Sequence, residues 1–268
     1  MSKTDKAITV IQPNKTELAE VPEFLREQLG NQAGMENVEQ GDLLLPRLGL
    51  CQALSPQKRV SHASYIPDLR EGQLFNTVTK EIYGDELEVI MLFFFKNRIK
   101  YFPIADGGGI DCISANGIDG GRISPDGCSI CKFSQFGNGA KDDEHGNEPP
   151  LCTLYHNYMN FTIGDIPSPI ALSYKSTGLK TSKQMLAEIR MTRLPMYAKK
   201  YKITVVTQRD GNNEWFEKKI TPIGFVDADT FKAMEKNFEA LKAMNIKVDT
   251  TGEEGVGDAS FDEGKTAF

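Results

Sequence analysis

Histidine and tryptophan are scarce in this chain, which has three His and one Trp among 268 residues. The sequence also lacks a phosphate-binding loop, the G-x-S-x-G motif of a serine nucleophile and the H-E-x-x-H motif of a zinc protease. General acid–base catalysis has few candidate groups when histidine is this rare. These absences predict that the protein is not an enzyme.

Long apolar runs are missing too. The longest, VIMLFFF at residues 89–95, falls far short of the roughly 20 residues that a membrane-spanning helix needs, and it indicates a buried strand. The first residues, MSKTDKAITVIQ, lack the basic-then-apolar pattern of a signal peptide. We therefore expect a cytoplasmic protein without a membrane partner. In a reducing compartment, its five cysteines favour metal ligation or burial over disulfides.

Negative charge is concentrated at the end of the chain. Residues 249–268 carry six acids and one lysine, or −5 of the total −6, so that residues 1–248 sum to about −1. Such a segment buries too little apolar surface to offset its ordering entropy, and we expect it to be disordered. An acidic tail that ends in Phe268 suits a basic partner or mimics a polyanion. A frayed terminus that aids solubility is the alternative.

The chain is predicted to have three parts. Residues 1–41 form a polar arm with one short helix, which begins at Pro22. Residues 42–248 form the main domain, and residues 105–152 are an insertion in it with almost no apolar periodicity. Strands are predicted at 73–84, 87–102, 153–164, 168–177, 202–208 and 214–226, the second following the first at hairpin spacing. Helices are predicted at 182–192 and 230–244, the latter capped by Asp227 or Asp229. The pattern favours an α+β protein, mainly antiparallel β: a barrel or sandwich with appended helices.

Four cysteines bound or occupy the insertion with the spacing C-x15-C-x2-C-x20-C: Cys112, Cys128, Cys131 and Cys152. The C-x2-C pair has zinc-knuckle spacing and follows the turn Asp126-Gly127. Four thiolates make a closed, structural zinc site, and metal binding can order a segment that has no core of its own. His145 could replace one cysteine, and small buried residues with a redox-labile pair are the alternative. Cys51 lies in an apolar stretch and is expected in the core.

Basic residues concentrate between positions 175 and 202, where eight basic side chains accompany one acid, Glu188. A second basic cluster ends the strand predicted at 87–102, and aromatic residues lie among these groups or in neighbouring strands. Cations that track phosphates, together with rings that stack on bases, are typical of single-strand binding. A solvated helix face with core aromatics is the alternative. The predicted DNA-binding residues are Lys96, Arg98, Lys100, Tyr101, Phe102, Tyr158, Phe161, Lys175, Lys180, Lys183, Arg190, Arg193, Tyr197, Lys199, Lys200, Lys202 and Trp215.

These features together resemble the phage single-stranded DNA-binding proteins. The resemblance covers most of the chain from about Asp42. It is carried by LLLPRLGLCQALSP (residues 43–56), the loop that closes at PPLC (residues 149–152), and the acidic tail that ends in Phe. It implies an OB-fold-like barrel, here with a zinc-ordered loop, that coats single-stranded DNA during replication and recombination. It also implies that the tail recruits replication or recombination proteins, through Asp258, Asp262, Glu263 and Phe268.

The tail departs from the bacterial form, which ends in consecutive acids followed by Ile-Pro-Phe. This one has Lys265 and no proline near its end, so a phage polymerase or recombinase fits as well as a host partner. If phage-encoded, the protein would act in the host cytoplasm. Association between copies of the chain is left open. The rival interpretation is a zinc-containing protein–protein interaction or assembly module that does not bind nucleic acid.

Overall fold

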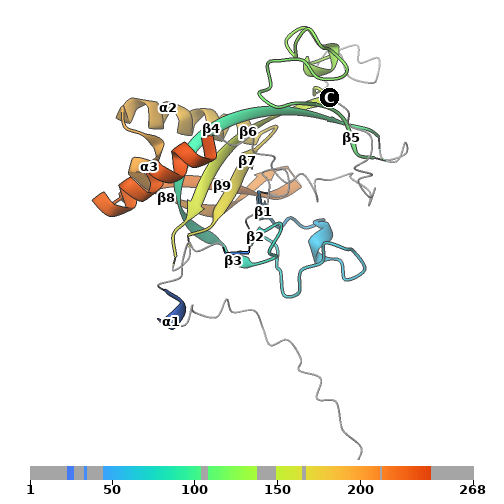
Figure 1. Ribbon diagram of the computed structural model, residues 1–268. Helices are drawn as coiled ribbons and strands as arrows, with labels where there is room; N and C mark the ends of the chain where they lie inside the picture. The colour runs from blue at the N-terminus through green and yellow to red at the C-terminus, as the bar shows by residue number, and fades with distance from the viewer. Residues whose placement is uncertain are drawn as a thin grey trace, which may run out of the picture. The chain divides into compact units, whose positions relative to one another are not determined.

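The computed structural model describes residues 23–26, 33–34, 45–103, 108–137, 149–164, 167–211 and 213–242. The chain divides into two units, Met1–Asn37 and Val38–Phe268. In the first unit, helix α1 (Glu23–Arg26) follows Pro22, where a short helix was predicted (Figure 1). The acidic tail lies outside the described residues, and the predicted limits of the three parts stay a prediction.

The second unit is built on a six-stranded antiparallel sheet. Its order is β7-β6-β4-β8-β9, and β5 pairs with the far end of β4 (Figure 1). The long strand predicted at 87–102 is confirmed as β4, and the hairpin predicted around residues 209–213 joins β8 to β9. The strands are β4 (Glu86–Tyr101), β5 (Ile110–Ser114), β6 (Cys152–Thr162), β7 (Pro169–Tyr174), β8 (Lys199–Asp210) and β9 (Asn213–Phe225).

A three-stranded sheet, β1 (Leu48–Leu50), β2 (Leu74–Asn76) and β3 (Ile82–Gly84), precedes it. The single strand predicted at 73–84 is wrong, because a turn divides it into β2 and β3. The Asn76 side-chain oxygen accepts hydrogen bonds from the backbone N–H groups of Val78 and Thr79, both 2.9 Å long. Such an Asx turn competes with strand pairing. The predicted hairpin with β4 is wrong as well, since β3 pairs with β2.

Two 15-residue helices, α2 (Gly178–Thr192) and α3 (Ala228–Lys242), match those predicted, although α2 begins four residues earlier. Asp227 caps α3 by accepting a 2.8 Å hydrogen bond from the Thr230 N–H. Helix α2 ends where Arg193 adopts a left-handed conformation (φ 54°), shortly before Pro195. The described residues also include three short 3-10 turns: η2 (Pro56–Lys58), η4 (Lys132–Ser134) and η5 (Met196–Ala198).

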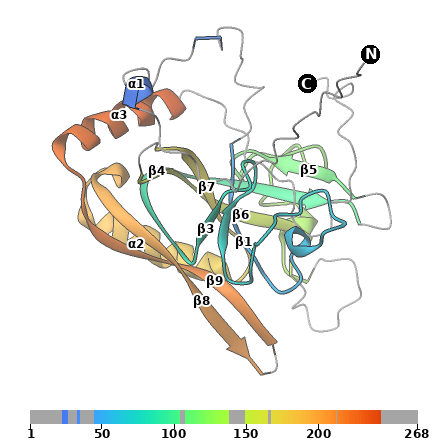
Figure 2. The same cartoon turned by 90° about the horizontal axis from the view of Figure 1, so that it is seen from below.

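The large sheet has a hydrophobic core on each face. Helices α2 and α3 lie towards the same end of the sheet, away from β5 (Figure 2). On one face, Val89 and Met91 of β4 pack with Tyr158, with the small sheet, and with Met185 and Ile189 of α2. On the other face, Ile90 and Leu92 pack with Met159, Tyr197 and α3. Successive side chains of β4 point alternately into the two cores. A shift of register between Met91 and Phe93 interrupts this alternation within the apolar part of the strand. The expected class, α+β and mainly antiparallel β, is confirmed.

The segment that contains β1 lies between the two outer strands of the large sheet. Before β1, Arg47 forms a parallel bridge with Ala171 of β7. After it, the Gln52 side chain exchanges hydrogen bonds of 2.8 and 3.0 Å with the backbone of Phe216 in β9. Residues 46–52 thus connect strands β7 and β9, while a closed OB-type barrel stays a prediction.

The insertion is more regular than predicted, because residues 110–114 form β5. Asp111, on that strand, is buried and forms ion pairs with Lys100 of β4 and Arg122 of the following loop. Burial by itself raises the pKa of Asp111, but hydrogen bonds and charges from Lys100 and Arg122 hold that pKa below its usual range. This charged cluster fixes the start of the insertion on the sheet.

A buried polar cluster ties α2 to the sheet. The Ser182 hydroxyl of α2 is fully buried and lies 2.7 Å from Nδ1 of His156 and 2.6 Å from the Tyr158 hydroxyl, both on β6. Burial lowers the pKa of His156, and the nearby cations of Lys96 and Lys183 act in the same direction, so that together they bring this pKa to about 4. His156 is therefore neutral in the folded protein at neutral pH.

This pKa predicts a pH-dependent stability. An unfolded histidine titrates near 6.5, so between pH about 6.5 and 4 the unfolded chain binds a proton that the folded chain excludes. The contribution of His156 is complete above pH about 6.5 and is lost as the pH falls towards 4. Denaturant titrations should show this fall in the free energy of unfolding. The His156→Gln variant should be less stable at pH 7, and its free energy of unfolding should change less with pH across this window. An unchanged dependence of the free energy of unfolding on pH in that variant would contradict the assignment.

Candidate nucleic-acid interface and metal centre

A groove of about 570 Å³ crosses the second unit between the outer ends of β7 and β9. Its walls come from residues 47–57, from residues 173–181 at the end of β7 and the start of α2, and from residues 214–218 of β9. We call it the tryptophan groove, because the only Trp of the chain, Trp215, lies on it. Its size suits a small molecule or one unit of a polymer.

Hydrogen bonds orient the polar side chains of this groove. Trp215 is half-buried, and its Nε1–H donates to Glu217 Oε1 over 3.3 Å. The same carboxylate oxygen accepts a 3.4 Å hydrogen bond from the Thr177 hydroxyl, which directly precedes α2. These two bonds connect β9 to the start of the helix. The indole is therefore held in place while part of its surface stays accessible.

Both signs of charge line the tryptophan groove. The cations are Arg47, Lys175 and Lys218, and the acids are Glu214 and Glu217, a net of +1. The Lys218 ammonium donates to the Leu48 carbonyl over 3.1 Å, and the Lys175 ammonium lies 5.9 Å from the ring centroid of Tyr155. Glu214 forms an ion pair with Arg209.

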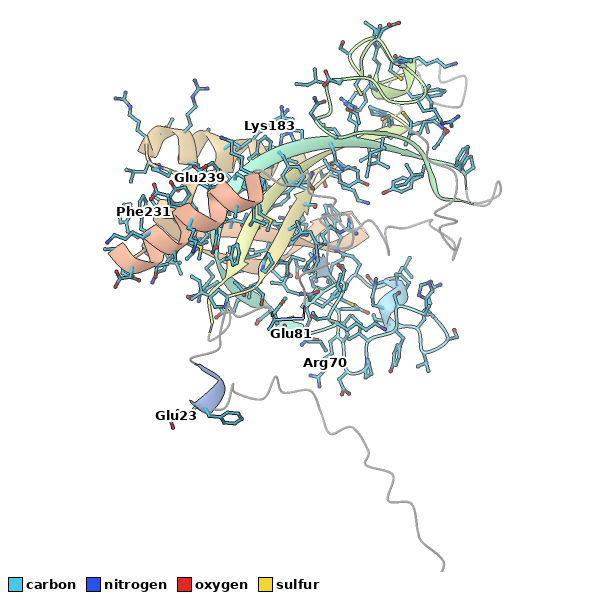
Figure 3. The ribbon with its side chains drawn as sticks, in the orientation of Figure 1. Glu23, Arg70, Glu81, Lys183, Phe231 and Glu239 are labelled. Carbon is cyan, nitrogen blue, oxygen red and sulfur yellow. The ribbon has the colours of Figure 1, made fainter. Side chains whose placement is uncertain are left out.

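The structure brings together part of the predicted basic surface. Lys180, Lys183 and Arg190 are exposed on α2, opposite the buried Met185 and Ile189, and Arg193 is exposed at the end of the helix. Lys183 and Lys96 of β4 both lie near enough to His156 for their charges to lower its pKa. Figure 3 shows Lys183 beside β4, on the side of the sheet where the loop with the cysteines lies.

Other predicted residues are engaged within the protein. Lys100 pairs with Asp111, Arg98 donates a 3.1 Å hydrogen bond to the Cys152 carbonyl, and Lys202 pairs with Glu86 and Glu88 at 3.2 and 3.6 Å. The ammonium of Lys199 lies 5.7 Å from the centroid of the Phe225 ring, and Lys200 is half-buried on β8.

The predicted stacking residues divide into core and surface groups. Tyr158 is 0 % exposed, Tyr197 is buried against α3, and Phe161 packs in the same core. The rings of Tyr158 and Tyr197 face protein in this structure, so the prediction that these two stack on bases is corrected, whereas Phe161 is only half-buried. Tyr101 is half-buried, whereas Phe102 is exposed, with the Arg122 guanidinium carbon 6.0 Å from its centroid.

Sequence reasoning missed Arg47, Tyr155 and Lys218 in the groove. The available signal was Pro46 within residues 43–54, because a proline in such a stretch is typical of an edge strand or an extended segment. The sequence did not indicate that this segment lies beside Lys175 and Trp215, because that placement depends on how the sheet curves.

The four insertion cysteines come together at the far end of β4. Cys112 of β5 and Cys152 of β6 are the register partners of Lys100, one on each side of it. Directly opposite residues in antiparallel strands project from the same face, and two strand spacings place these cysteines about 10 Å apart. The fold therefore presents two thiols, 40 residues apart in sequence, on one face.

The other two cysteines lie in the cysteine loop, residues 115–151 (green above β4 in Figure 1). Cys128 and Cys131 enclose a turn in which the Cys131 N–H donates to the Cys128 carbonyl over 3.3 Å. The ring of Phe133, two residues later, lies with its centroid 4.9 Å from the Lys100 ammonium. The knuckle is thus beside the strand residue that separates Cys112 from Cys152.

The thiols also interact electrostatically. Burial raises the pKa of Cys152, Arg98 opposes the rise, and the thiols of Cys128, Cys112 and Cys131 add to it, so that the pKa is about 11. All five cysteines are free, and Cys51 is fully buried in a separate core with Ile66, Leu69 and Phe75, as predicted. Within the described ranges, no three Cys, His, Asp or Glu side chains are already arranged as a metal site. His145 lies outside these ranges.

Comparisons with known proteins give a family. A family model described as Pam3 phage gp34-like protein matches residues 14–247, most of the chain. No curated protein and no solved structure matches significantly. Among the described residues, no helix is long and apolar enough to cross a membrane. The chain is therefore a phage protein, and it belongs to the Pam3 phage gp34-like family.

Proposed function

We propose that this protein binds single-stranded DNA without catalysing a reaction, and that it coats exposed strands during phage replication and recombination in the host cytoplasm. The observation that carries the proposal is the tryptophan groove, which combines a partly accessible indole with cations from three segments. Single-strand binding uses these two elements, because rings stack on bases of any sequence and cations follow the phosphates.

The path of the strand follows from the chemistry of the walls. Arg47, Lys175 and Lys218 supply positive charge for phosphates, and the first turn of α2 lies on the same groove. A base stacks on Trp215. The link that residues 46–52 make between β7 and β9 supports a barrel of the OB type, in which nucleic acid binds across the strands.

The exposed cations of α2, together with Lys96, extend this interface. They lie on one side of the sheet, and the groove begins at the N-terminal end of the same helix. Further nucleotides would contact them mainly through phosphates, since the rings of Tyr158 and Tyr197 are buried.

A fluorescence titration tests the proposal, because Trp215 is the only Trp and reports on the groove directly. Oligo-dT should quench its emission at low salt, and the affinity should fall steeply as salt rises, through counterion release. Trp215→Ala, followed by anisotropy of a labelled oligonucleotide, should weaken binding about 5- to 150-fold, the equivalent of about 1–3 kcal/mol of stacking.

The matched control is Phe225→Ala, which removes an exposed ring from the other end of β9. It should leave the affinity unchanged. Absence of binding at low salt would refute the proposed function, and an equal loss in both variants would refute the role of the groove.

We further propose that Cys112, Cys128, Cys131 and Cys152 hold one structural zinc ion. Four thiols are the donor set of closed zinc sites. Their proximity here, from two strands and one knuckle, supports the assignment. The ion would order the cysteine loop and neutralise buried thiolates. Binding would draw the thiols together and release their protons.

Elemental analysis should find about one zinc per chain, as a single four-ligand site implies. Cys128→Ser with Cys131→Ser should lose the metal and make the cysteine loop sensitive to protease, while the thermal unfolding of the remaining domain persists. Cys51→Ala is the control, because that thiol is buried in another core, and it should retain the metal. A metal-free protein with a protected loop would contradict this assignment.

The acidic tail is proposed to recruit replication or recombination proteins and to compete with DNA for the basic surface. Its −5 charge complements the +7 of residues 175–202. Deletion of residues 249–268 should raise DNA affinity at low salt, and less so at high salt, because the competition is screened. A full-length tail with its six acids changed to amides should behave like the deletion. Unchanged or weaker DNA binding would count against competition.

One observation favours an interaction module as a second candidate. The cysteine loop exposes Ile118, Ile130 and Phe136, each more than half accessible. Apolar side chains clustered on an ordered loop suit a protein partner. This candidate predicts no oligonucleotide affinity at any salt concentration, so the titration above separates the two functions.

A further inference from the structure

Glu217 is out of place in a groove proposed to hold a polyanion, because its charge repels phosphate. It is half-buried, and its Oε1 accepts the hydrogen bonds from Trp215 and Thr177. Across the described part of the chain, no hydrogen bond to its other oxygen, Oε2, is found. The second acid of the groove differs, since Oε2 of Glu214 lies 2.6 Å from the Arg209 side chain.

The place of this carboxylate suits the edge of a base. Trp215 and Glu217 are two residues apart on β9, so both project from one face of the strand. Oε1 lies 3.3 Å from Nε1, at the rim of the indole. A base stacked on the indole presents its own rim there, within reach of the carboxylate, whereas its phosphates lie farther out, towards the cations.

We propose that Glu217 makes the tryptophan groove select a base with an exocyclic amino group over thymine. A carboxylate only accepts hydrogen bonds, and cytosine N4, adenine N6 and guanine N2 are donors, whereas thymine carries carbonyl oxygens in these places. The inference rests on the proposed function and refines it, because stacking and phosphate contacts alone are indifferent to the base. The carboxylate adds a preference at one nucleotide of each bound strand.

The test compares oligo-dT with the same oligonucleotide in which alternate thymidines are replaced by deoxycytidine, at neutral pH. The wild-type protein should bind the cytosine-containing strand about fivefold more tightly, as expected for one hydrogen bond of about 1 kcal/mol. A strand with N4,N4-dimethylcytosine keeps the ring but loses the donor, and it should bind no better than oligo-dT.

Glu217→Gln is the decisive variant. Its amide oxygen can still accept from Trp215 and Thr177, while an NH₂ donor replaces the free acceptor, so the preference should vanish or reverse towards thymine. Glu214→Gln removes the same charge from the same groove and should retain the preference. Should Glu217→Gln fail to fold, the dimethylcytosine strand tests the inference on the wild-type protein.

Two results overturn the inference while leaving the proposed function intact. One is equal wild-type affinity for the two strands. The other is a cytosine preference that survives either Glu217→Gln or dimethylation. Failure of the wild-type protein to bind any of these oligonucleotides refutes the proposed function itself, and the inference with it.

Discussion

The pairing of β4 along its whole length is the constraint on which the rest of the second unit depends. Its first residues pair with β8, residues 89–100 pair with β6, and its last residues pair with β5. The apolar run at residues 89–95 is therefore covered on both faces, by α2 and by α3. The strand then continues beyond both cores and carries Lys100 between Cys112 and Cys152. One strand thus supports the hydrophobic centre and the thiol cluster.

The two candidate sites occupy different parts of this framework. The tryptophan groove needs β7 and β9 to approach each other across residues 46–52, so it depends on the curvature of the sheet and on the contacts of Arg47 and Gln52. The thiol cluster needs only the local register of β5, β4 and β6. A defect in the cysteine loop is therefore expected to leave the groove in place, whereas loss of the Gln52–Phe216 hydrogen bonds would widen it.

Sequence reasoning found what is local. The period of β4, the turn between β8 and β9 and the cap at Asp227 each depend on neighbouring residues, and these three predictions are confirmed. The Asx turn at Asn76 is equally local, but it was missed. Sequence reasoning failed where partners are distant. Tyr158 and Lys175 were both predicted to bind DNA, although Tyr158 lies in the core and Lys175 borders the groove. Alternation shows that two residues share a face, but only the packed helix α2 shows which face is buried.

The order of the cysteine loop cannot come from a hydrophobic core. Neither main core includes any residue from 102 to 151 among those described, and Ile113, Ile118, Ile130 and Phe136 are exposed. What holds the loop is polar: Asp111 with Lys100 and Arg122, and the Ser134 hydroxyl on the carbonyls of Cys128 and Cys131. Hydrogen bonds of this kind contribute about 1 kcal/mol each, comparable to the cost of ordering one residue. If the four cysteines bind zinc as proposed, the metal would add to this polar network the stabilisation that a hydrophobic core provides elsewhere.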